Sequence, residues 1–167
     1  EKCFTWKFDD SGNVKAGPSE HNFVDGKCSV CGIYLVDYAY DSASQTYYVT
    51  GVASGITEET ITIASTYNDG THGEHAVTYV AKKAFENKTT IKRVIMPSIT
   101  DLGGQVFWGC ENLEYVDMRS VTYIKYNQPG RPDGATESNN NFRFCNSLAT
   151  VIVGNGYSSE TGQFNSD

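Results

Sequence analysis

The sequence repeats itself from Val77-Thr-Tyr-Val-Ala-Lys-Lys-Ala-Phe85 to Ile99-Thr-Asp-Leu-Gly-Gly-Gln-Val-Phe107, 22 positions later. An alternating run follows each stretch, Ile91-Lys-Arg-Val-Ile-Met96 in the first copy and Leu113-Glu-Tyr-Val-Asp-Met118 in the second. A fixed period in the low twenties, with apolar residues at the same phase, is typical of a solenoid. In such a protein each unit buries its apolar side against the next unit.

Two further copies flank this pair. Downstream, Phe142-Arg-Phe-Cys-Asn-Ser-Leu148 matches Phe107-Trp-Gly-Cys-Glu-Asn-Leu113 at a spacing of 35, which exceeds the period by 13 residues. The excess predicts an inserted loop at about 127–141, whose composition indicates a mobile segment that is too polar to pack. Upstream, Thr60-Ile-Thr-Ile63 has the phase of Arg93-Val-Ile-Met96 and is a degenerate first copy.

Alternation within each copy predicts a short strand with one face turned inward. The other face turns six side chains outward on successive strands, and these are the candidate binding residues: Arg93, Ile95, Tyr115, Asp117, Thr150 and Ile152. Solenoids commonly bind along such a face, and tyrosine and arginine are frequent anchors of protein interfaces. A merely solvated sheet face is the alternative.

The repeat resembles the BspA-like leucine-rich repeats of bacterial surface proteins. The resemblance spans about Val49 to Val153 and is carried by Val77-Thr-Tyr-Val80, Lys83-Ala-Phe85, Leu102-Gly103, Phe107, Cys110-Glu-Asn-Leu113 and Val116. Lys88 departs from the motif, because it stands where Cys110 and Cys145 stand in the later copies. The resemblance implies a leucine-rich-repeat solenoid in a secreted or cell-surface bacterial protein that adheres to host or microbial surface molecules.

The predicted fold is α+β to mostly β, in three parts. A small Cys/His module occupies 1–36, a β-hairpin cap and the degenerate first repeat occupy 37–66, and the leucine-rich-repeat solenoid occupies 67–167. The hairpin is expected to pair Tyr34–Tyr40 with Gln45–Val52, because a turn signal near Asp41 separates two alternating runs. A terminal unit of this kind covers the open end of a solenoid.

The first part holds three of the five cysteines. Cys28 and Cys31 form a Cys-x-x-Cys knuckle, and with Cys3 and His21 they make a Cys₃His set that suits tetrahedral zinc. A structural zinc would also explain how so short and polar a segment folds. The alternative is a disulfide between two of the three cysteines, with the third left free.

The other two cysteines, Cys110 and Cys145, share one repeat phase. We expect small buried thiols there rather than a disulfide between neighbouring copies. His72 and His75 lie in the polar segment Thr66–His75, which is predicted to be a loop, and we expect a solvated pair rather than a metal site.

Composition excludes several classes of function. The net charge of −7 disfavours a nucleic-acid partner, because the phosphate backbone demands basic surfaces. No apolar run approaches the roughly 20 residues of a membrane-spanning helix. The chain has three histidines and no positioned base, Gly-x-Ser-x-Gly elbow or phosphate-binding loop, so it is not expected to be an enzyme.

These observations predict a non-enzymatic recognition or adhesion protein at the cell surface or outside the cell. It would act as a monomer, and its partner would be a surface protein or a glycan. The first alternative is a structural spacer in a larger surface protein. A weaker alternative is a metal-dependent enzyme that uses the Cys/His set with one coordination position left open for water.

Overall fold

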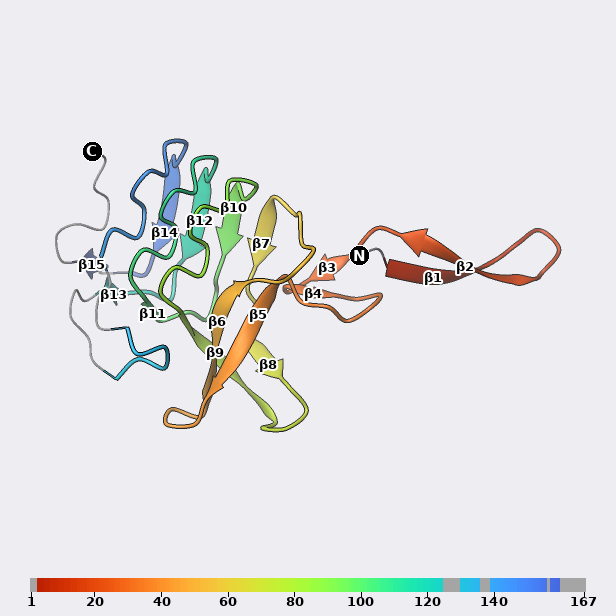
Figure 1. Ribbon diagram of the computed structural model, residues 1–167, viewed down its shortest axis with the longest axis horizontal. Helices are drawn as coiled ribbons and strands as arrows, with labels where there is room; N and C mark the ends of the chain where they lie inside the picture. Colours follow the sequence, from red (N-terminus) through yellow and green to blue (C-terminus); the bar gives the residue numbers. More distant parts are fainter. Residues whose placement is uncertain (1–2, 125–129, 136–138, 156, 160–167) are drawn as a thin grey trace.

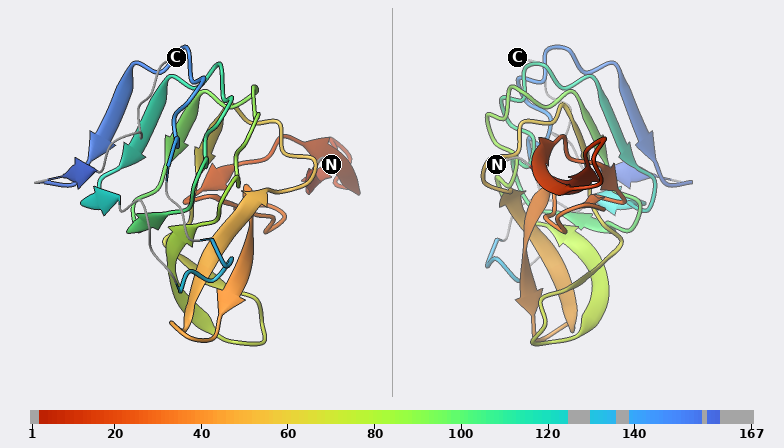
Figure 2. Two further views of the ribbon diagram at one scale, coloured as in Figure 1. Left: turned by 60° about the vertical axis from the view of Figure 1, so that its left-hand side comes forward. Right: turned by 90° about the vertical axis from the view of Figure 1, so that its right-hand side faces the viewer.

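Successive repeat copies contribute four short strands to one parallel sheet, and these strands stand side by side in a row (Figures 1 and 2). The computed structural model describes residues 3–124, 130–135, 139–155 and 157–159. It is strand-rich, as expected, and contains no helix within these ranges. The four strands are β7 (Thr60–Thr62), β10 (Arg93–Ile95), β12 (Tyr115–Met118) and β14 (Thr150–Val153), paired in the order β14-β12-β10-β7.

The register of this sheet joins equivalent positions of the copies. Arg93 pairs with Tyr115 of the next strand and with Thr60 of the degenerate copy, and Tyr115 pairs with Thr150 beyond the insertion. A one-residue slip would turn every inward side chain outward, so burial of one face fixes this register. The inward residues Ile61, Val94 and Val116 are fully buried.

Three phenylalanine rings form a stack on the other side of the repeat units. The rings of Phe85 and Phe107 lie 5.4 Å apart at 7°, and those of Phe107 and Phe142 lie 5.3 Å apart at 12°. All three side chains are buried. Each ring therefore has the equivalent ring of a neighbouring copy as its main contact, and the insertion before Phe142 does not break the stack.

The thiols at the shared cysteine phase are buried or half-buried and free, as expected. The Cys110 thiol donates to the carbonyl oxygen of Phe85 at 2.9 Å, and the Cys145 thiol donates to that of Phe107 at 3.0 Å. Burial raises the pKa of Cys110 to about 11, so this thiol stays protonated. Each thiol thus links one copy to the backbone of the copy before it.

A second sheet crosses beneath the first (Figure 1). It follows the order β11-β9-β6-β5, and β8 pairs with β9 off this path. Its strands are β5 (Val36–Asp41), β6 (Thr46–Val52), β8 (Thr66–Asn68), β9 (Glu74–Val80) and β11 (Asp101–Leu102). The antiparallel pairing of β5 with β6 agrees with the expected hairpin, whereas its role as a cap stays a prediction.

The segment Thr66–His75 differs from the expected loop. Thr66 pairs with Ala76 and Asn68 pairs with Glu74, so β8 and the start of β9 form a hairpin. Asp69 closes its turn, because its carboxylate accepts the backbone N–H groups of Thr71 and His72 at 2.8 and 2.9 Å. These bonds also lower the pKa of Asp69, so the carboxylate remains charged.

Three two-stranded sheets complete the described chain. They are β1 (Cys3–Phe8) with β2 (Val14–Ser19), β3 (Phe23–Val24) with β4 (Lys27–Cys28), and β13 (Tyr123–Ile124) with β15 (Ser158–Ser159). The β1–β2 hairpin projects away from the rest of the molecule, and Phe8 near its tip is 76% exposed (Figures 1 and 2).

The inserted loop corrects a sequence-based expectation. Residues 125–129 and 136–138 lie outside the described residues, but within 130–135 the side chains of Arg131 and Ala135 are buried. Arg131 is 7% exposed and binds Asp101 through Nε and Nη2 at 2.9 and 3.1 Å. Asp133 accepts hydrogen bonds from the Tyr79 hydroxyl at 3.1 Å and from the Lys82 amide at 2.7 Å. Charged side chains are tolerated here because partners on β9 and β11 satisfy them.

We predict that Phe107→Ala lowers the free energy of unfolding by about 3–5 kcal/mol, because the central ring of the stack leaves a cavity between two neighbours. Denaturant unfolding of the whole chain measures this change. Phe8→Ala is the control and should change stability by less than about 0.5 kcal/mol, since that ring is exposed. Equal losses in the two variants would contradict the stacking account.

We also predict that Asp133→Ala releases the docked part of the inserted loop. The Lys82 amide would lose its acceptor and exchange its proton at least about tenfold faster, as expected when local opening becomes easier. Amide hydrogen exchange measures this rate, and Asp10→Ala, which removes an exposed carboxylate from the β1–β2 turn, is the control. Unchanged exchange at Lys82 would show that the bond does not hold the loop.

Candidate functional site

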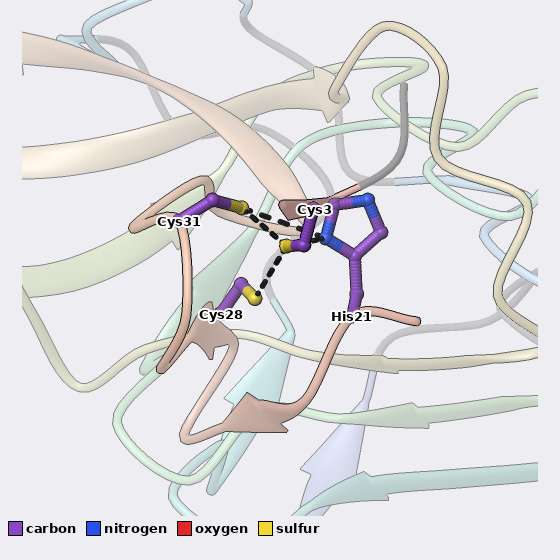
Figure 3. A group of neighbouring side chains, drawn as sticks. All are labelled: Cys3, His21, Cys28 and Cys31. Atoms are coloured by element: carbon purple, nitrogen blue, oxygen red, sulfur yellow. Dashed lines mark hydrogen bonds between the residues drawn. The ribbon is translucent and has the colours of Figure 1, made fainter. Parts of the chain in front are cut away.

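Four potential metal ligands from distant parts of the first 31 residues meet at one point (Figure 3). Cys3 begins β1, His21 lies between β2 and β3, Cys28 ends β4, and Cys31 follows in the next turn. The Cys3 sulfur is 2.8 Å from His21 Nδ1, 2.8 Å from the Cys31 sulfur and 3.3 Å from the Cys28 sulfur. The ligand atoms all lie within 4.8 Å of one another, so this set could hold a metal ion.

The donor set fits a closed tetrahedral site. Zinc–sulfur bonds of about 2.3 Å place tetrahedral sulfur ligands roughly 3.8 Å apart, slightly wider than the distances here. A metal would therefore move the sulfurs of Cys28 and Cys31 away from that of Cys3 by roughly 0.5–1 Å. All five cysteines are free, so the structure contains no disulfide among them. The four ligand atoms are thus placed as the predicted metal site requires.

Local hydrogen bonding already favours a thiolate in this cluster. Burial opposes ionisation of Cys28, but the backbone amides of Cys31 and Val30 and the His21 side chain outweigh it and lower the pKa to about 5. Burial, together with the neighbouring thiols Cys31 and Cys28, raises the pKa of Cys3 to about 12. In this cluster the pKa of Cys3 is therefore raised while that of Cys28 is lowered. A divalent cation would lower both, because it stabilises several thiolates at once.

The β3–β4 hairpin, which carries Cys28, also touches the repeat sheet directly. The turn of the β3–β4 hairpin contains Gly26 with φ +73°, and a β-carbon built there would lie 2.2 Å from the Thr62 carbonyl oxygen. Only glycine permits both this left-handed conformation and this approach. The Leu35 amide donates to the Gly26 carbonyl at 2.9 Å, which joins the knuckle to the chain that enters β5. The Cys/His cluster is thus tied to the first strand of the repeats.

The outward side of the four-stranded sheet carries the predicted binding residues in two rows. Register places Thr60, Arg93, Tyr115 and Thr150 in one row and Thr62, Ile95, Asp117 and Ile152 in the other. Arg93 is exposed, and its guanidinium lies 4.0 Å from the centroid of the Tyr115 ring. This cation–π contact presents an arginine and an aromatic ring as one unit at the centre of the face. Thr150 is exposed, and Ile95 and Ile152 are half-buried.

Asp117 was expected to face solvent, but it is buried and only 3% exposed. Arg119 lies over it, and its Nε donates to Asp117 Oδ1 at 3.0 Å while Nη2 forms an ion pair with Oδ2. The hydrogen bonds from Arg119 lower the pKa of Asp117, so the pair stays charged. Sequence reasoning missed Arg119, although its place two residues after Asp117 gives it the same outward phase.

The two histidines of the β8–β9 hairpin lie outside the Cys3 set, which within the described ranges is the group of three or more potential ligands that the structure brings together. His72 Nδ1 lies 2.7 Å from Asp69 Oδ2, and its ring stacks on Tyr40 at 4.1 Å. His75 Nε2 lies 2.9 Å from the His72 carbonyl oxygen. Both rings therefore serve local structure.

Three solved leucine-rich-repeat proteins are similar to this chain, and each comparison covers 72% of it. The T. pallidum protein TpLRR has a TM-score of 0.54 at 20% identity, with 51% of its own length covered. A protein from Bacteroides ovatus has a TM-score of 0.51 at 18% identity, with 40% of its own length covered. A protein from Bacteroides capillosus has a TM-score of 0.51 at 23% identity, with 95% of its own length covered. The chain thus spans about half or less of the first two proteins.

At these identities the similarity establishes a leucine-rich-repeat type of fold and nothing finer. No protein-family model matches the chain, and no curated protein matches it. Over the ranges that the structure describes, no helix has the length and apolar character needed to cross a membrane.

We predict that the purified chain binds about one equivalent of zinc and that Cys28→Ser abolishes this binding, because a structural site needs all four ligands. Elemental analysis measures the ratio. Cys110→Ser is the matched control, since it removes an equally buried thiol in the repeats and should leave the zinc content unchanged. Loss of zinc in both variants, or in neither, would contradict the assignment.

Proposed function

We propose that this chain is a non-enzymatic recognition module of the BspA-like leucine-rich-repeat type, located at the cell surface or outside the cell. It forms a solenoid with a period of about 22 residues, capped at its N-terminal end by the β5–β6 hairpin. It binds a surface protein or glycan along the outward face of the four-stranded sheet and the adjoining loops. A structural zinc ion in the Cys₃His cluster holds the N-terminal module in place.

The unit formed by Arg93 and Tyr115 carries this proposal. The guanidinium is held 4.0 Å over the ring, which fixes both side chains before any partner arrives. Pre-ordered side chains lose less conformational freedom on binding, and tyrosine and arginine are enriched among residues that dominate interface energetics. Threonines and isoleucines surround the pair in the two rows, and Asp117 is paired with Arg119.

Apart from Arg93, charged side chains on or beside the outward face of the four-stranded sheet are paired with each other. Arg119 neutralises Asp117, and Lys92 binds Glu59 at 2.7 Å beside the strands. Arg93 is therefore the cation most available to a ligand on this face. The arrangement favours a partner with an acceptor group, such as a carboxylate or a carbonyl, opposite Arg93.

A structural role for the metal supports the non-enzymatic assignment. Three sulfurs and one imidazole nitrogen supply all four ligands of a tetrahedral zinc ion, so no position is left for water or substrate. Catalytic zinc sites instead keep one position open. The four ligands also come from separate segments, and joining such segments is what a structural metal does in a small polar module.

The experiment compares the wild-type chain with Arg93→Ala/Tyr115→Ala as immobilised baits for biotinylated surface proteins and glycoproteins of epithelial cells. We expect the double variant to lose at least about 90% of the ligand captured by the wild type, as for loss of a central interface anchor. The matched control is Trp108→Ala/Arg143→Ala, which removes another cation–π pair, 5.0 Å apart, outside the four strands of this sheet. Equal capture by all three baits would remove the strand face as the binding site and favour the spacer.

A further inference from the structure

A cavity of about 520 Å³ lies where the Cys/His module meets the β5–β6 hairpin and β8. This volume falls within the range of roughly 300–1,000 Å³ that small-molecule sites occupy. His21 comes from the module, Tyr34 and Tyr38 from the chain entering and forming β5, Ser54 from the turn after β6, and Tyr67 from β8. Since the walls come from separate segments, the cavity exists only in the folded whole.

Three tyrosine rings form one wall of this cavity. The ring of Tyr38 stacks on that of Tyr67 at 4.3 Å, and Tyr34 meets both rings edge-on at 5.5 and 4.9 Å. The Tyr38 hydroxyl is tied down, because it accepts the backbone N–H of Ala64 at 3.2 Å. The three rings thus support one another, and the parts that line the cavity can pack against the C–H groups of a ligand.

Four polar groups on the same walls have no hydrogen-bond partner among the described residues: the hydroxyls of Tyr34, Ser54 and Tyr67 and the carboxylate of Asp37. Each hydroxyl can donate one hydrogen bond and accept others, and the carboxylate accepts only. The cavity therefore offers several donors and acceptors beside an aromatic surface. A polyhydroxylated ring matches this combination, because each sugar hydroxyl both donates and accepts.

Charge and polarity narrow the choice of ligand. Asp37 disfavours an anionic ligand, and no lysine or arginine lines the cavity to offset it. A cationic ligand would be attracted by Asp37 and the rings but repelled by Lys27, whose Nζ lies 5.1 Å from the centroid of the Tyr34 ring. A wholly apolar ligand would cover the hydroxyls of Tyr34 and Tyr67 without giving them a hydrogen-bond partner, which is costly. A neutral ligand rich in hydroxyls suits these walls best.

We propose that this cavity binds a short neutral saccharide, with the Tyr34–Tyr38–Tyr67 wall against one face of a sugar ring and the Asp37 carboxylate accepting from its hydroxyls. This site is separate from the outward strand face. His21 belongs both to the cavity wall and to the Cys₃His cluster, so a bound metal fixes the position of one wall.

The test is an NMR titration of the zinc-loaded whole chain with galactose, glucose, mannose, N-acetylglucosamine and lactose, with glucuronate and choline as charged comparators. We expect at least one neutral sugar to shift the ring signals of Tyr34 and Tyr67 in a saturable way, with a Kd on the order of 1 mM. Asp37→Asn should weaken that binding about tenfold, because a hydrogen bond to a charged acceptor is lost. Asp37 is exposed, so this variant should fold normally.

Two controls separate this site from the outward strand face. Arg93→Ala/Tyr115→Ala should bind the sugar with unchanged affinity, whereas Tyr67→Phe should weaken it by removing one hydroxyl from the cavity. The proposal is overturned if no neutral sugar shifts the two rings at about 50 mM, well above the Kd of a weak site. It is also overturned if Asp37→Asn binds unchanged or if glucuronate or choline binds more tightly.

Discussion

Contact between equivalent residues of neighbouring repeat copies is the constraint on which this structure depends. Phe107 packs between Phe85 and Phe142, and the backbone beside it receives the thiol of the following copy. Each repeat unit has an apolar side that it can bury only against a neighbouring unit. The same constraint holds the four strands in one register, and that register in turn places Arg93 beside Tyr115 on the outer face.

Specific polar contacts help to hold both additions to the repeats. The inserted loop is docked by Arg131 on Asp101 and by Asp133 on Tyr79 and Lys82. The N-terminal module meets the repeats at Gly26 and is gathered internally by the Cys₃His cluster. Segments with few apolar residues need such specific anchors to stay folded. We propose that zinc bound by this cluster supplies the stability that a larger hydrophobic core would otherwise give the module.

The sequence was informative wherever spacing alone decides structure. The matched positions of the repeat copies predicted the partners in the four-stranded sheet, and residue type predicted which four side chains gather in one cluster. It failed where a polar side chain depends on a partner far along the chain. The loop around Arg131 looked too polar to pack because its acceptor, Asp101, lies 30 residues away. The sequence did not predict the cavity, because Tyr67 lies far along the chain from Tyr34 and Tyr38 and meets them only in the folded protein.

The central proposal is that Cys3, His21, Cys28 and Cys31 hold a structural metal with no open coordination position. X-ray absorption at the zinc edge of the metal-loaded protein tests it most directly. We predict three sulfur ligands at about 2.3 Å and one nitrogen at about 2.0–2.1 Å, with no oxygen ligand. A site with fewer sulfurs and a bound water would contradict the claim, because it would show an open metal able to act on a substrate.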